Sequence, residues 1–355
     1  MIGNSTITVE RIHPEHFNII EEAIQFIDSP SLLGYHTPAY MTALTKVLDD
    51  NPLYLVAFFE EKVAGFLPLL WRTGKFGTVI NGLPFFGPNG GPVLTIVGFE
   101  HAEAVVNAFC NALEVLTSDL DAISVVLYTP FLFNPVIMQM AFKPDRIIER
   151  FTQYIEIPGS PITWPTRSRR AVARAKKKDC LVRTGTTNDL SELLEIYKEN
   201  CRAAEIPLKP DEYFYQVVNN LCPAGIARFT VAECNNEMVA CLITMQCAKT
   251  VSYNVPCSRI KARTFQANSL LIDEAVHHFQ RLGYKYWNWE ASPNRQHPVY
   301  EFKQNWGSLE SPYYVLLRYP KGLNPFADVT AQEISSAYPF YFVIPFDDLE
   351  RKSAA

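Results

Sequence analysis

Four side chains that can move protons or stabilise charge lie in one short segment near residue 300. They are Glu290, His297, Glu301 and Lys303. A carboxylate or an imidazole can accept a proton from an attacking nucleophile, so the first three are candidate general bases. A fixed ammonium, such as that of Lys303, can stabilise negative charge that develops on an oxygen. The alternative for Lys303 is an ordinary surface lysine, because lysines are mostly exposed.

Five further polar side chains of the same half are candidate substrate ligands: Tyr253, Asn254, Ser292, Arg295 and Tyr300. Arg295 lies in a polar loop and has the chemistry to bind a carboxylate or a phosphate. A solvated loop arginine is the alternative there, and a buried core tyrosine is the alternative for Tyr253.

The eight cysteines show no spacing typical of a metal site. Cys110 stands alone in the first half, the other seven are scattered from Cys180 to Cys257, and no Cys-x-x-Cys pair occurs. We therefore expect no metal ion, buried free thiols and a reducing compartment.

Length and composition indicate a globular protein of two domains. The chain has 355 residues, of which 48% are hydrophobic and 19% are charged. Its first six residues carry no basic or apolar stretch of the secretory type, and its apolar runs are shorter than the roughly 20 residues that span a bilayer. These features predict a soluble cytoplasmic protein, with the inner membrane surface as an alternative place of action.

A basic segment interrupts an otherwise acidic chain. The stretch from Arg167 to Lys178 contains seven cations and no acid, so with a net charge of −5 the remainder carries −12. On a helix, Arg170 and Arg174 would line up with Lys178 opposite a strip of small apolar residues. A solvated face, a site for a diphosphate and a contact with the phosphates of a transfer RNA are the three interpretations.

The order of predicted elements in the first half is repeated in the second half. Each half reads as helices, a strand hairpin, a further helix and a closing strand, with the hairpins at 53–70 and 227–246 and the last strands at 122–128 and 284–289. Such a repeat indicates two copies of one α+β fold, each a mostly antiparallel mixed sheet flanked by helices. We place the domains at 1–165 and 166–320, with a C-terminal extension at 321–355 whose Tyr338–Pro345 run we expect to pack only on the second domain.

The segment from Tyr286 to Gly307 carries a family resemblance. An aromatic strand, a serine, a short loop and then Phe-Lys-x-x-Trp-Gly at residues 302–307 resemble the Fem family of peptidoglycan-bridge aminoacyltransferases. These proteins are tandem GNAT-like domains, and the basic segment resembles the helix that opens their second domain. The resemblance implies that Phe302 and Lys303 lie at the reaction centre, where the lysine stabilises developing charge and the ring can hold its cation.

The resemblance also implies a reaction and its partners. The expected activity is transfer of an acyl or aminoacyl group to an amine of a cell-envelope precursor or amino sugar. Possible donors are acyl-CoA, acyl-carrier protein and aminoacyl-tRNA, and the acceptor would be a phosphorylated small molecule or lipid-linked precursor. A thioester-dependent N-acyltransferase on a small amine and a non-catalytic binding protein with a degenerate cleft remain as alternatives.

Two departures leave the donor open. The place expected for a glycine-rich pyrophosphate turn, residues 263–269, has no glycine, although Arg259, Lys261 and Arg263 could meet phosphates. No long helical-hairpin insertion of the kind found in some tRNA-using members is present. The glycine-rich stretch at 81–92 lacks a Lys-Ser/Thr ending, which excludes a phosphate loop of the nucleotide-hydrolase type.

Overall fold

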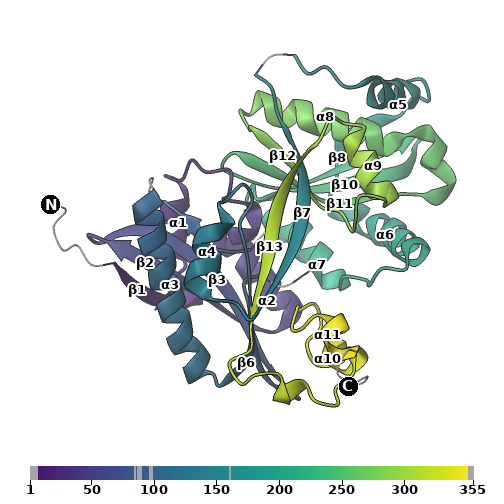
Figure 1. Ribbon diagram of the computed structural model, residues 1–355. Helices are drawn as coiled ribbons and strands as arrows, with labels where there is room; N and C mark the ends of the chain where they lie inside the picture. Colours follow the sequence, from purple (N-terminus) through teal and green to yellow (C-terminus); the bar gives the residue numbers. More distant parts are fainter. Residues whose placement is uncertain (1–6, 84, 86–89, 96–98, 160, 351–355) are drawn as a thin grey trace. The chain divides into compact units, whose positions relative to one another are not determined.

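The computed structural model divides into two compact units that interleave along the chain (Figure 1). It describes residues 7–83, 85, 90–95, 99–159 and 161–350. Within these, unit 1 comprises 7–27, 49–151 and 312–350, and unit 2 comprises 28–48 and 152–311. The domain boundaries predicted at residues 165 and 320 divide the chain into consecutive segments. The units of the structure are not consecutive, because the segment 28–48 belongs to unit 2. It does so because helix α2 (Pro38–Leu48) packs on α7 (Asp211–Gln216) of that unit.

Unit 1 is built on a mixed sheet. Its strand order is β1 (Thr8–Ile12), β2 (Asn51–Phe59), β3 (Lys62–Gly74), β4 (Gly77–Asn81), β6 (Ala122–Tyr128) and the end of β13 (Leu309–Arg318), with β5 (Val93–Leu94) beside β3. Among the strands that the structure describes there, only β4 and β6 pair in parallel. The helices are α1 (Asn18–Ile24), α3 (Phe99–Asp119) and α4 (Pro135–Phe142), and the apolar face of α3 packs on the sheet through Val105, Phe109 and Leu113.

Unit 2 has a sheet of the same kind. Its strand order is the end of β7 (Arg146–Glu156), β12 (Tyr286–Ala291), β11 (Thr250–Ser258), β10 (Glu237–Cys247), β9 (Ala227–Cys234) and β8 (Leu181–Thr184). Among these described strands, only β11 and β12 pair in parallel. The helix α8 (Ala267–Arg281) buries Leu271, Ala275 and Phe279 against Trp287 and Trp289 of β12. Besides α2 and α7, its helices include α5 (Thr166–Lys176), α6 (Leu190–Ala204) and α9 (Pro298–Gln304).

The two sheets confirm the repeated α+β order predicted from the sequence. The hairpins β2–β3 and β9–β10 lie where the alternation placed them, and β6 has the predicted bounds. Several elements were not predicted, among them β1, β4, α4 and α9. Two of the sequence-based expectations involve residues outside the described part of the chain. Residues 84 and 86–89 belong to the glycine-rich stretch at 81–92, and the first six residues were used to predict the localisation.

The C-terminal extension packs on unit 1, so the expectation that its Tyr338–Pro345 run packs on the second domain is wrong. It contains α10 (Ala331–Ala337) and α11 (Phe346–Glu350). The Tyr338 hydroxyl donates to the Gly77 carbonyl at 2.8 Å, and the Tyr341 hydroxyl donates to Asp50 at 3.0 Å. Asp50 is 6% exposed and also accepts from Arg72 at 2.5 Å, so a buried ion pair fixes this extension in place.

The expectation of free thiols is wrong for two of the eight cysteines. Cys180 and Cys234 form a disulfide. Cys180 directly precedes β8, whose Leu181 pairs with Glu233 of β9, and this antiparallel register places the two sulfurs opposite each other. The remaining six are free. A reducing compartment therefore no longer follows from cysteine usage. Among the described helices, none is long and apolar enough to cross a membrane.

Candidate functional site

The parallel strands β11 and β12 of unit 2 separate after three residue pairs. Pairing runs from Thr250 with Tyr286 to Ser252 with Asn288, while β11 continues to Ser258 and β12 to Ala291. In a strand–helix–strand unit such as β11–α8–β12, ligands commonly bind beyond the carboxyl ends of the strands, where the helix also begins. The candidate site is therefore at this end of the β11–β12 pair.

Glu290 lies at the carboxyl end of β12, in a bend. The pairing with β7 slips by one residue between Asn288 and Glu290, which is a β-bulge. Glu290 has a φ of +61°, which is uncommon for a residue with a side chain. Its N–H donates to Asn288 Oδ1 at 2.9 Å, and Asn288 in turn accepts from the Thr152 hydroxyl at 2.9 Å. Bulges of this kind redirect a side chain next to a functional site.

A chain of three hydrogen bonds leads to the Glu290 carboxylate. The Tyr213 hydroxyl of α7 donates to Asn254 Oδ1 at 2.8 Å. The Asn254 amide donates to the Tyr35 oxygen at 2.9 Å, and the Tyr35 hydroxyl donates to Glu290 Oε1. Tyr35 and Tyr213 are 5% and 2% exposed. Each donor in this series points toward Glu290. The series of hydrogen bonds therefore favours the ionised form of the carboxylate, which accepts hydrogen bonds and cannot donate one.

Burial and two lysines set the protonation of this site. Burial raises the pKa of Glu290 to about 7, and the Tyr35 hydrogen bond and the charges of Lys209 and Lys303 oppose that rise. Burial also lowers the pKa of each lysine to about 8, against the attraction of Glu290. A carboxyl group that titrates near neutral pH is suited to accepting a proton from an amine.

Lys303 is buried, at 3% exposure, and does not point into solvent. Its ammonium donates to the carbonyl oxygens of Glu290 at 3.1 Å and of Ala291 at 2.7 Å. The ring of Phe302 lies against Trp289 and Trp306, with centroids 6.2 and 6.5 Å away, so it anchors α9 to the core. The structure thus places two of the candidate site residues, Lys303 and Glu290, next to each other.

The other two candidate bases lie away from the bend. The Glu301 carboxylate is 65% exposed and forms an ion pair with Arg167 at 2.6 Å. His297 is the residue before α9, and its Nδ1 accepts from the Val299 N–H at 3.2 Å, which makes it a helix cap. Of the three, Glu290 alone combines burial with hydrogen bonds from other functional candidates.

Ser292 and Tyr253 stand next to the bend but are already bonded. The Ser292 hydroxyl donates to Gln153 Oε1 at 2.8 Å. The Tyr253 oxygen accepts from Asn268 at 2.9 Å, and its ring packs edge-on to Trp289 at 5.0 Å. Both side chains support the sheet around Glu290.

Arg295 and Tyr300 share one surface carboxylate. Arg295 binds Glu310 through Nη2 at 2.7 Å and through Nε, and the Tyr300 hydroxyl donates to the same carboxylate at 2.5 Å. This pair is partly exposed and is engaged within the protein.

The predicted basic helix is α5, which begins at Thr166 with Pro165 as its cap residue. It buries Ser168, Val172 and Ala175 against the unit and exposes its arginines. Arg167 reaches Glu301, whereas the described part of the chain gives Arg170 and Arg174 no ion pair. The exposed cations are the part of this helix that can contact a phosphorylated ligand.

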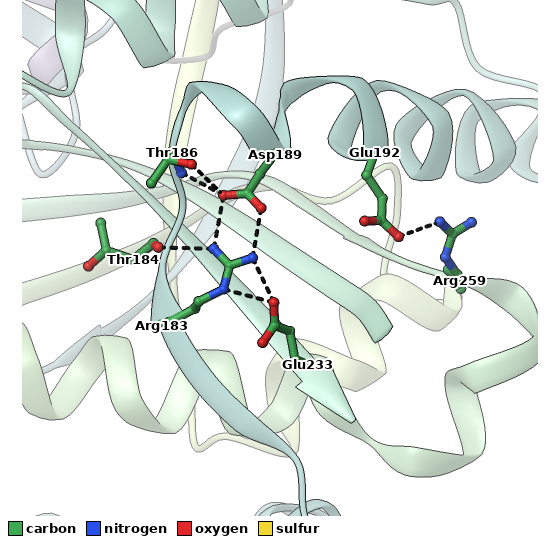
Figure 2. A network of polar contacts seen from close by, with 7 residues as sticks. All are labelled: Arg183, Thr184, Thr186, Asp189, Glu192, Glu233 and Arg259. Atoms are coloured by element: carbon green, nitrogen blue, oxygen red, sulfur yellow. Dashed lines mark hydrogen bonds and ion pairs between the residues drawn. The ribbon is translucent and has the colours of Figure 1, made fainter. Parts of the chain in front are cut away.

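Near the start of α8, two of the three basic residues proposed for phosphates form ion pairs. Arg259 pairs with Glu192 at 2.7 Å, as Figure 2 shows, and with Glu195 at 2.9 Å. Lys261 is 3.8 Å from Glu237, and Arg263 is exposed without an ion pair to any described residue. Gln266, with a φ of +62°, caps α8 and adopts the left-handed turn for which glycine was expected.

The sequence did not reveal Tyr35, Tyr213 or Lys209. Lys209 is half-buried and lies 4.5 Å from the centre of the Tyr213 ring. Tyr35 is 255 positions from Glu290 in the chain, and no local pattern marks it. The only signal was the composition, which includes 17 tyrosines, because a buried tyrosine hydroxyl usually has a hydrogen-bond partner.

Comparisons with known proteins agree with this architecture. Residues 166–292 match the family model of the acetyltransferase (GNAT) domain. The structure of FemX has a TM-score of 0.66 at 12% identity, covering 86% of this chain and 96% of FemX. The C-terminal DUF2156 domain of a putative lysylphosphatidylglycerol synthetase from Agrobacterium fabrum has a TM-score of 0.57 at 11% identity, covering 93% and 99% of the two chains.

A tandem GNAT protein from the clavulanic acid biosynthesis pathway has a TM-score of 0.52 at 10% identity, covering 88% of this chain and 97% of that one. No curated protein sequence matches significantly. The match over residues 166–292 and these structures agree with a Fem-like GNAT fold, which confirms the predicted tandem architecture. At these identities the structural likeness concerns the fold.

Proposed function

We propose that this chain is an N-acyltransferase that moves an acyl or aminoacyl group to an amine, with Glu290 as the general base. The observation that carries the proposal is the Glu290 carboxylate, which burial tunes to a pKa of about 7 at the end of the separating strands. The GNAT domain match over 166–292 supports the reaction class. The acceptor would be an amine of a cell-envelope precursor or an amino sugar.

In the proposed reaction, Glu290 removes a proton from the acceptor ammonium. The neutral amine then attacks the donor carbonyl carbon, a tetrahedral oxyanion forms, and its collapse expels a thiol or a hydroxyl group. Tyr35 holds one carboxylate oxygen in place, which leaves the other for the amine. Burial strengthens these interactions because little water competes for them.

The donor in this proposal is a thioester of coenzyme A, with acyl-carrier protein and aminoacyl-tRNA as alternatives. Support comes from the start of α8, where Gln266 takes the left-handed turn and leaves the first helical N–H groups for an anion. Arg263 adds an exposed cation beside it. All three donors carry phosphate groups, so anion binding at the start of α8 does not distinguish one donor from another.

For the acceptor, the exposed face of α5 favours a phosphorylated molecule, such as a nucleotide-linked or lipid-linked sugar. Arg170 and Arg174 lie one helical turn apart on that face, and guanidinium groups bind phosphate oxygens bidentately. Replacing both with glutamate should weaken acceptor binding and raise KM, with kcat little changed.

The test is to incubate the protein with labelled acetyl-CoA, acyl-carrier protein and aminoacyl-tRNA separately, together with a nucleotide-linked amino-sugar acceptor. One donor should transfer its label, and Glu290→Gln should lower the rate on the order of 10²-fold or more. Glu301→Gln is the matched control, because it removes an exposed carboxylate of the same segment. A Glu290→Gln protein that transfers as fast as the parent would refute the assignment. A protein that binds the acceptor and transfers from none of the donors would favour the binding-protein alternative.

A further inference from the structure

The backbone at Glu290 needs support that the sheet does not give it. Beyond Ser252 and Asn288, β11 no longer pairs with β12, so the end of β12 loses a neighbour on that side. Backbone carbonyls that lack water and a strand partner must find another donor. Glu290 also holds a left-handed φ of +61°, which costs about 1 kcal/mol or more for a residue with a side chain.

Lys303 supplies the donors for this stretch. Its ammonium binds two consecutive carbonyls, those of Glu290 and Ala291, at 3.1 and 2.7 Å. Asn288 holds the other side of the same residue, through the Glu290 N–H at 2.9 Å. The Glu290 backbone is therefore clamped at both its N–H and its carbonyl.

The helix that carries Lys303 is itself fixed. Phe302 and Trp306 flank Lys303 in sequence, and their rings pack on Trp289, the residue before Glu290. On the opposite side, the Ser168 hydroxyl of α5 donates to the Asn305 carbonyl at 2.5 Å. An ammonium on such a helix has little freedom to leave the two carbonyls and follow a substrate.

We propose that Lys303 is a positioning residue, which holds the β12 bend and thereby aims the Glu290 carboxylate at the Tyr35 hydroxyl and the acceptor amine. This inference rests on the proposed role of Glu290 as base. It differs from the role implied by the family resemblance, in which the lysine stabilises developing charge. Two of the three ammonium protons are committed to the backbone, so the geometry favours the support role.

A structural experiment tests the inference without an activity assay. Crystal structures of Lys303→Met and Lys303→Arg are compared with the parent, with Lys198→Met on α6 as a control. In Lys303→Met, Glu290 should leave the left-handed conformation and lose its contact with Tyr35, whereas Lys303→Arg, which keeps the charge and the donors, should retain both. If Glu290 keeps both features in Lys303→Met, the inference is wrong. Should Lys303→Met fail to fold, Lys303→Gln gives the same readout, because its shorter amide cannot reach both carbonyls.

Kinetics then separate the two roles of the lysine. If Lys303 acts through Glu290, Lys303→Met should lower transfer by roughly tenfold or more in the parent, and by less than about twofold in a Glu290→Gln background. Equal losses in both backgrounds would show that the lysine acts on the reacting atoms, and would overturn the inference. A failure of the proposed function is distinct, because there Glu290→Gln alone would leave transfer unchanged.

Discussion

Replacing Glu290 with glutamine should make the protein more stable at alkaline pH. Burial raises the pKa of Glu290 from its ordinary value of 4.5 to about 7, so the folded protein holds a proton that the unfolded chain has already released. Between these two values the unfolded state binds fewer protons, and stability therefore falls as pH rises. The difference of about 2.5 pH units, at about 1.4 kcal/mol each, amounts to about 3 kcal/mol once the carboxyl is ionised.

Glutamine keeps the shape and the oxygen that accepts from Tyr35, but it has no proton to lose. Below about pH 4.5 the parent and Glu290→Gln should therefore be equally stable, and by pH 8 the variant should exceed the parent by about 3 kcal/mol. Urea unfolding at a series of pH values measures this, with Glu301→Gln as the exposed control. A difference that is absent at pH 8, or constant across pH, would refute the electrostatic description of the site.

Three further changes have defined outcomes. Tyr35→Phe removes a hydrogen bond that lowers the pKa of Glu290, so the midpoint of the acid limb in a pH–rate profile should rise by about 1–2 pH units; an unmoved midpoint would contradict the contact. Replacing both Cys180 and Cys234 with serine removes a disulfide that links residues 54 positions apart, which should lower the free energy of unfolding by about 2–4 kcal/mol. Reductant should then no longer change the stability of the variant. A remaining effect of reductant would argue against this pairing. Gly185→Ala places a methyl carbon 2.3 Å from the Phe229 ring, whereas at Gly159 nothing lies within 4 Å. In thermal unfolding, Gly185→Ala should lower the free energy of unfolding by about 1–3 kcal/mol and Gly159→Ala should change it little. Equal effects of the two variants would contradict the packing.

The elements that the sequence predicted well are those with a strong internal period. The helix predicted between the hairpin and the last strand of the second half is α8, because its apolar residues recur on one face and bury against the sheet. The strand ending near Trp289 and the carboxylate that follows it were also found, since an acid at a strand end is a local feature. Such features depend on neighbours in sequence.

The remaining parts of the site depend on neighbours in space. Tyr35 reaches Glu290 only because the segment 28–48 packs within unit 2, although in sequence it directly precedes the hairpin β2–β3 of unit 1. Likewise, Cys180 and Cys234 meet through the register of β8 and β9, which their sequence spacing does not reveal. The bend at Glu290 arises from a one-residue slip against β7, and a slip of this kind leaves no mark in the alternation of β12.

The two copies of the fold differ at the ends of their corresponding parallel strands. The parallel pair β4–β6 of unit 1 corresponds to β11–β12, yet its pairing continues to Asn81 with Val126. There the Asn81 amide donates to the Phe342 carbonyl at 2.9 Å, and the Ser124 hydroxyl donates to the Val343 carbonyl at 2.6 Å. These are neutral groups that bind the chain's own C-terminal extension, whereas the corresponding strands of unit 2 separate and carry a tunable carboxylate. At these strand ends, one copy of the fold thus binds its own C-terminal extension, and the other carries an ionisable carboxylate, where we propose that the acceptor binds.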